Sequence, residues 1–122
     1  SFLMSIKDDV QRVAEVIQNV LKVDVTIADN KFERIAGTGR FYELIGCLIE
    51  IDTAFAKVLE DGKSFFIENP GNCNVCNTCS KKGSCRELAE ICCPILFEGK
   101  AIGVIGLVVF DERKREDFIE NR

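Results

Sequence analysis

Six of the seven cysteines in this 122-residue chain are crowded into positions 73–93, and the chain has no histidine. The six are Cys73, Cys76, Cys79, Cys85, Cys92 and Cys93. The stretch 72–84 is polar and lacks the apolar periodicity of a helix or a strand, so a hydrophobic core cannot hold it. Closely spaced thiolates can bind one metal centre and fix such a segment. The sequence therefore predicts a cysteine loop at 72–85 that is organised by metal ligation.

We predict a four-cysteine ligand set, with two substitutes. Ser84 and Glu87 form a capping box that starts a short helix reaching about position 90, and a helix N-terminus favours the thiolate form of Cys85. In a strand that begins at Ile91, successive side chains point to opposite faces, so only one of the next two cysteines faces the loop. The predicted ligands are Cys76, Cys79, Cys85 and Cys92. Cys73 and Cys93 are alternates, or resolving thiols for redox chemistry.

The identity of the centre remains open between related chemistries. The spacing Cys76-x2-Cys79-x5-Cys85 resembles auxiliary 4Fe-4S sites, whereas zinc sites more often pair two distant C-x-x-C knuckles. Without histidine, the ligands are all thiolates, or a carboxylate, water or outside ligand completes the site. We expect a 4Fe-4S cluster first, zinc second and a metal-free thiol switch third. Cys47 stands alone among apolar residues, and we expect it in the core.

Composition excludes several classes of protein. The net charge is −4, and the basic stretch 113–115 is flanked by acidic residues, which disfavours direct nucleic-acid binding. The longest apolar run, 101–110, is too short to cross a membrane. The first residues show no basic region followed by a long apolar stretch, so we expect a cytoplasmic location. The length fits one domain spanning 1–122.

The N-terminal part predicts an amphipathic helix over 5–22, starting at a capping box made by Ser5 and Asp8. Its apolar residues recur three or four positions apart, like the seam of a heptad repeat. They are Ile6, Val10, Val13, Ile17 and Val20, widened by Val16 and Leu21. This seam packs on a sheet, or its remaining apolar edge forms a homodimer.

The rest of the chain reads as alternating strands and short helices. Strands are predicted over 23–28, 32–38, 63–68, 91–97 and 101–110, and a helix over 53–60. Glu98 and Gly99 mark a hairpin turn, and a charged connector helix follows from 111. Gly103 and Gly106 either allow a helix to approach the last strand closely or open a ligand pocket. The order predicts an α+β fold with an antiparallel sheet flanked by helices.

The hairpin segment CCPILFEGKAIGVIGL, from Cys92 to Leu107, resembles the closing hairpin of GAF domains. Two further segments extend this resemblance over nearly the whole chain. They are VDVTIADNKFERIAGTG, which ends at Gly39, and the cysteine loop after Pro70. The chain thus resembles the N-terminal PAS/GAF-like sensory domain of sigma-54-dependent transcriptional regulators.

This resemblance implies a regulatory domain without enzymatic activity, which controls a downstream ATPase module and a helix-turn-helix DNA-binding module. The cysteine loop would then hold a centre that senses redox state, oxygen or a small ligand. Two other functions stay open: a small-molecule-binding GAF domain with a structural zinc or thiol switch, and a GAF-like methionine sulfoxide reductase that uses loop cysteines.

Overall fold

A computed structural model describes residues 1–49, 54–67, 89–109 and 120. In them, five antiparallel strands form one sheet in the order β2-β1-β5-β4-β3. The strands are β1 (Asp24–Asp29), β2 (Arg34–Gly37), β3 (Phe65–Ile67), β4 (Ala89–Phe97) and β5 (Lys100–Val109). The predicted α+β class with an antiparallel sheet is confirmed. The cysteine loop and the connector helix from 111 lie outside the described residues.

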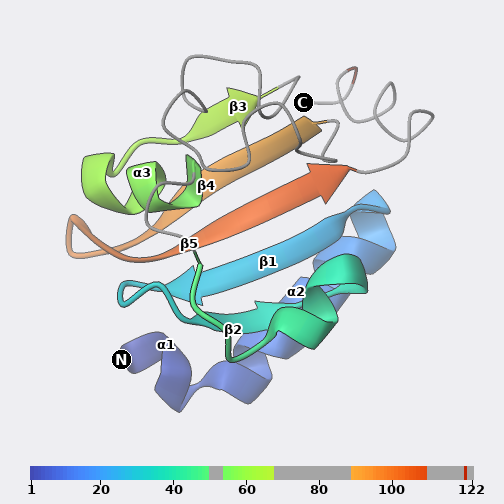
Figure 1. Cartoon of the computed structure of the whole chain (residues 1–122), viewed down its shortest axis with the longest axis horizontal. Coiled ribbons are helices and arrows are strands. Elements are labelled where there is room, and N and C mark those ends of the chain that lie inside the picture. Colours follow the sequence, from blue (N-terminus) through green and yellow to red (C-terminus); the bar gives the residue numbers. More distant parts are fainter. Residues whose placement is uncertain (50–53, 68–88, 110–119, 121–122) are drawn as a thin grey trace.

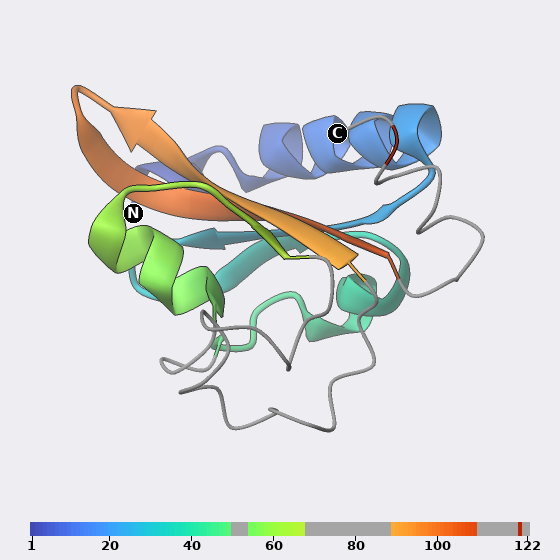
Figure 2. The same cartoon turned by 90° about the horizontal axis from the view of Figure 1, so that it is seen from above.

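Helical segments cover both faces of this sheet (Figures 1 and 2). They are α1 (Phe2–Ser5), α2 (Lys7–Leu21), the 3-10 helix η1 (Gly39–Leu44) and α3 (Ala54–Asp61). The face covered by α1 and α2 is called the α2 face, and the opposite face, covered by η1 and α3, is called the α3 face. Each face buries its own apolar cluster.

Strand β1 is buried on both of its sides, although its sequence alternates apolar and more polar residues. Val25 and Ile27 belong to the apolar cluster of the α2 face, whereas Ala28 belongs to that of the α3 face. Thr26 is also buried, because helical segments cover the sheet on both sides. A strand at this position needs small or apolar residues on each side.

The N-terminal helix begins later than predicted, and Ser5 does not cap it. The N-cap of α2 is Ile6, which makes no side-chain capping bond, and the Ser5 hydroxyl donates to the carbonyl oxygen of Phe2. Ser5 ends α1 instead, a short turn whose own cap is Ser1. Asp8 and Asp9 still lie in the first turn of α2, where negative charge complements the helix dipole.

The closing hairpin is confirmed, but β4 starts two residues before the predicted strand. Ala89 pairs with Val109 and Glu90 with Val108, so both residues belong to the sheet rather than to the end of a helix. Glu98 and Gly99 form the turn, with φ values of 52° and 80°. A two-residue hairpin turn of type I′ requires positive φ at both positions.

The two glycines of β5 lie where side chains from helices approach the sheet. An added Cβ on Gly106 would collide with the Phe55 ring of α3, and one on Gly103 would collide with Leu3 of α1. The prediction that these glycines allow a helix to approach the last strand closely, rather than open a ligand pocket, is therefore confirmed.

Candidate metal centre

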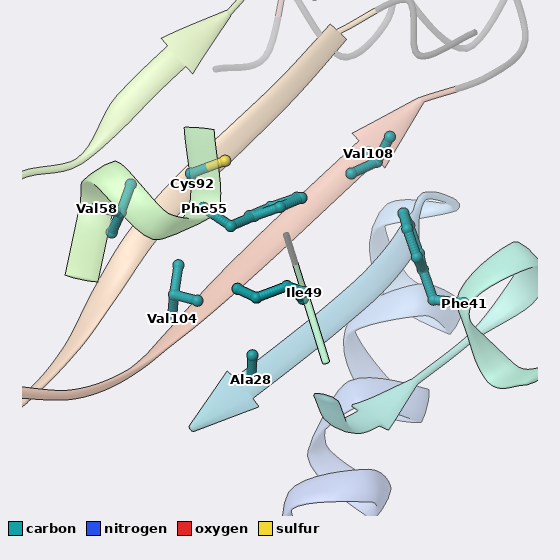
Figure 3. Packing of buried hydrophobic residues seen from close by; sticks show 8 residues of the cluster. All are labelled: Ala28, Phe41, Ile49, Phe55, Val58, Cys92, Val104 and Val108. Atoms are coloured by element: carbon teal, nitrogen blue, oxygen red, sulfur yellow. The ribbon is translucent and has the colours of Figure 1, made fainter. Parts of the chain in front are cut away.

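Strand β4 carries two adjacent cysteines on opposite faces of the sheet. Cys92 is fully buried on the α3 face, where it belongs to the same apolar cluster as Phe55 and Val58 (Figure 3). Its neighbours in the adjacent strands are Phe65 and Gly106. Cys93 pairs with Ile105 and is half-buried on the α2 face. The predicted separation of the two thiols by strand geometry is thus present in the fold.

The other predicted ligands, Cys76, Cys79 and Cys85, and the alternate Cys73 lie outside the described residues. The four-ligand set therefore stays a prediction. Within the part of the chain that the structure describes, no three potential ligands among Cys, Asp and Glu are grouped closely enough to hold a metal ion. Any centre at β4 needs ligands from beyond that part.

Cys47 lies at the surface, so its predicted place in the core is wrong. It follows η1, and its carbonyl oxygen accepts a hydrogen bond from the backbone amide of Arg34 at 3.0 Å. The backbone is thus held against β2 while the side chain faces outward. The apolar residues around it in the sequence misled the prediction, because Leu44, Ile45 and Leu48 are exposed as well.

Glu90 is a buried carboxylate that sequence reasoning did not single out. Its side chain is only 2% exposed, and its Oε2 atom is fully enclosed. Glu90 lies two residues before Cys92 on β4, so both side chains are on the α3 face. Glu90 and Cys92 are separated by one residue, which puts both on the same face of a strand. A predicted strand beginning at Ala89 instead of Ile91 would have included Glu90 and indicated its burial.

A second buried charge on the α3 face is Arg34 of β2, which is 8% exposed. Its Nε donates a hydrogen bond to Oγ1 of Thr26 at 2.7 Å, and its guanidinium lies 5.4 Å from the centre of the Phe41 ring. Hydrogen bonding and the aromatic face both compensate for burying a cation. The burial of Arg34 was also not predicted, because nothing in the sequence distinguishes a buried arginine in a strand from an exposed one.

None of the described helices is long and apolar enough to cross a membrane. No protein-family model matches the chain. A curated relative is a sigma-54-dependent transcriptional regulator of Escherichia coli that is named for uric acid. It is 29% identical over 122 residues, covering 99% of this chain and 21% of the regulator, so the chain spans about a fifth of that relative.

Solved structures share the fold at low sequence identity. A GAF domain of A. aeolicus in an inactive state has a TM-score of 0.64 at 20% identity, covering 93% of this chain and 75% of that one. The GAF domain of an Acinetobacter phosphoenolpyruvate-protein phosphotransferase has a TM-score of 0.67 at 15% identity, with the same coverage.

An enzyme has the same fold. The type II free methionine-R-sulfoxide reductase of Thermoplasma acidophilum has a TM-score of 0.67 at 13% identity, covering 98% of this chain and 88% of that enzyme. The fold is thus shared by GAF domains and a reductase, whereas the sequence match that covers 99% of this chain is to a fifth of a regulator. The chain thus has the fold of GAF domains, and over nearly its whole length its sequence is similar to part of a sigma-54-dependent transcriptional regulator.

Proposed function

We propose that this domain senses redox state, oxygen or a small ligand in the cytoplasm through a cysteine-ligated centre at the start of β4, and that it acts as a regulator rather than as an enzyme. The observation that carries the proposal is the burial of Cys92 on the α3 face, seven residues after Cys85 in the sequence. A buried thiol beside a cysteine-rich segment can close a metal site while apolar neighbours keep water out.

The proposed ligands are Cys76, Cys79, Cys85 and Cys92, with Cys73 and Cys93 as alternates. A 4Fe-4S cluster is the favoured centre and zinc the alternative, since both take thiolate ligands. An iron–sulfur cluster would respond to oxygen or to electron transfer, whereas zinc has no redox chemistry of its own. The two identities therefore predict different signals.

The proposed output is control of a downstream ATPase and a DNA-binding module in the full-length protein. The sigma-54-dependent relative is almost five times as long as this chain, which leaves room for such modules. Loss or oxidation of the centre would change the start of β4, and β4 pairs with β5 along its whole length. Strand β5 leads directly into the predicted connector helix from 111, so a shift in the hairpin would reach the next module.

The test is the ATPase rate of the full-length protein, purified without oxygen and then exposed to air or to a chelator. The proposal expects the rate to change with the state of the centre in the wild type. In Cys85→Ser, the rate should be fixed at one value under all three conditions. An ATPase rate that is the same in all states of the wild type would refute the regulatory proposal.

We also propose that the domain forms a homodimer through the terminal helices. Val13, Val16 and Val20 of α2 are 54%, 60% and 71% exposed, whereas Val10 and Ala14 of the same helix are buried against the sheet. Three valines at spacings of three and four form a stripe on the outer side of α2. A second copy of the chain would remove this stripe from water.

A further inference from the structure

Phe32, in the turn between β1 and β2, has a backbone conformation that aromatic residues rarely adopt. Its φ is 67°, in the left-handed region that favours glycine. Such strain persists only where the surroundings hold the residue in place. Two contacts do so here, because the ring packs against the apolar cluster of the α3 face and the carbonyl oxygen accepts a hydrogen bond from the Ile49 amide at 2.6 Å. Phe32 therefore joins the turn to a segment that follows η1.

That segment, residues 46–49, is called the strap, and it runs beside the edge strand β2. The Gly46 amide donates a hydrogen bond to the carbonyl oxygen of Arg34 at 2.7 Å. The Arg34 amide donates in turn to the carbonyl oxygen of Cys47 at 3.0 Å. Backbone hydrogen bonds to β2 and to the turn before it therefore hold the strap in place.

Side chains hold the strap at one end only. Ile49 is 6% exposed and belongs to the same apolar cluster as Val104 (Figure 3). The side chains of Cys47 and Leu48 are exposed. At the other end, Gly46 has a φ of 92°, and an added Cβ there would meet nothing within 4 Å. A segment with so few buried contacts opens locally at a lower free energy than the whole molecule unfolds.

We propose that the strap is a conformational device that opens as one unit, with Phe32 as its latch and Gly46 as its hinge. When the Phe32 ring leaves the apolar cluster, its backbone can return to an unstrained conformation, and the hydrogen bond from Ile49 is lost with it. Opening uncovers the outer edge of β2 and the part of the α3 face that Ile49 covers. The device needs no metal, so it is independent of the proposed cysteine centre.

The test is native-state hydrogen exchange of the whole chain, followed by NMR. The amides of Arg34, Gly46 and Ile49 are the reporters, because each donates a bond between the strap and the β1–β2 hairpin. Their protection factors should agree within about threefold and lie at least roughly tenfold below those of β5. The Thr38 amide donates to the carbonyl oxygen of Val25, away from the strap, and should be protected more strongly than the reporters.

Substitutions at Phe32 separate the ring from the backbone strain. Phe32→Ala removes the ring and keeps the strain, so exchange of the reporter amides should become roughly tenfold faster, with that of Thr38 unchanged. Phe32→Gly also removes the ring but fits a left-handed φ, so its effect should be roughly fivefold smaller. Lys31 in the same turn has no positive φ, so Lys31→Gly should accelerate exchange at least as much as Lys31→Ala.

The outcomes separate the strap from its latch. If the reporter amides of the wild type exchange independently of one another, or only together with those of β5, the strap is refuted. Equal effects of Phe32→Ala and Phe32→Gly would refute Phe32 as a strained latch. The wild-type measurement needs no substitution, so it decides the first question even where a variant fails to fold.

Discussion

Cys92 and Cys93 are neighbours in the sequence, yet the sheet gives them different environments. Cys92 is enclosed on the α3 face with Phe55 and Val58, while Cys93 is half-buried on the α2 face. Alternation along a strand causes this difference, and it was predictable from the sequence once the strand was recognised. The burial of Glu90 was not predictable in this way. The start of β4 depends on the pairing of Ala89 and Glu90 with Val109 and Val108 of β5, which are distant in the sequence.

The Gly106→Ala substitution is predicted to lower the free energy of unfolding by about 1–3 kcal/mol. The added methyl group would meet the Phe55 ring, and Cγ2 of Thr26 is 3.0 Å from the same point. Urea unfolding of the whole chain measures the change. In a Phe55→Leu background the loss should be smaller, since the ring that collides is gone. Equal losses in both backgrounds would contradict this contact as the cause.

The side-chain amide of Gln11 joins helix α2 to strand β2. It pairs with the Gly37 backbone through two hydrogen bonds, as a residue of a neighbouring strand would. Nε2 of Gln11 donates to the carbonyl oxygen of Gly37 at 2.9 Å, and the Gly37 amide donates to Oε1 of Gln11 at 2.9 Å. Strand β2 is an edge strand of the sheet, so these two bonds satisfy backbone groups that no outer strand reaches. After Gly37 the chain enters η1, which covers the α3 face. Gln11 therefore ties α2 to the end of the edge strand β2.

Gln11→Ala is predicted to destabilise the chain by about 1–3 kcal/mol, the net value of two hydrogen bonds. Hydrogen exchange of the Gly37 amide should become faster by a larger factor than exchange of amides in β5. Gln18→Ala is the matched control, since it removes the same side chain from the half-buried side of α2, and its effect should be under about 0.5 kcal/mol. Equal effects of the two variants would argue against the Gln11 bridge.

The described part of the molecule has a sheet with helical segments on both faces, a closing hairpin of β4 and β5, and an apolar stripe on α2. The α+β class, the order of the strands along the chain and the hairpin turn were predictable, because alternation, turn residues and glycines are local signals. The order of strands in the sheet and the burial of Arg34 were not, because they depend on contacts between distant segments. The exposed position of Cys47 was missed because its apolar neighbours in the sequence, among them Leu44, Ile45 and Leu48, are themselves exposed.

The proposed homodimer would bury the valine stripe of α2 between two copies of the chain. If α2 forms the interface, Val16→Glu should convert the wild-type dimer to a monomer, because it places a charge in the middle of the valine stripe. Sedimentation equilibrium of the whole chain measures the mass. Glu15→Lys changes a neighbouring exposed residue and should leave the dimer intact. A monomeric wild type, or a dimer that persists in Val16→Glu, would contradict an interface at this position.

The central claim is that buried Cys92, and not its neighbour Cys93, belongs to a cysteine-ligated centre. Iron, sulfide and zinc content of the chain, purified without oxygen after careful reconstitution, tests it most directly. We predict close to one centre per chain in the wild type and in Cys93→Ser, with strong loss in Cys92→Ser. Negligible metal in the wild type, or equal metal content in the two variants, would contradict the account.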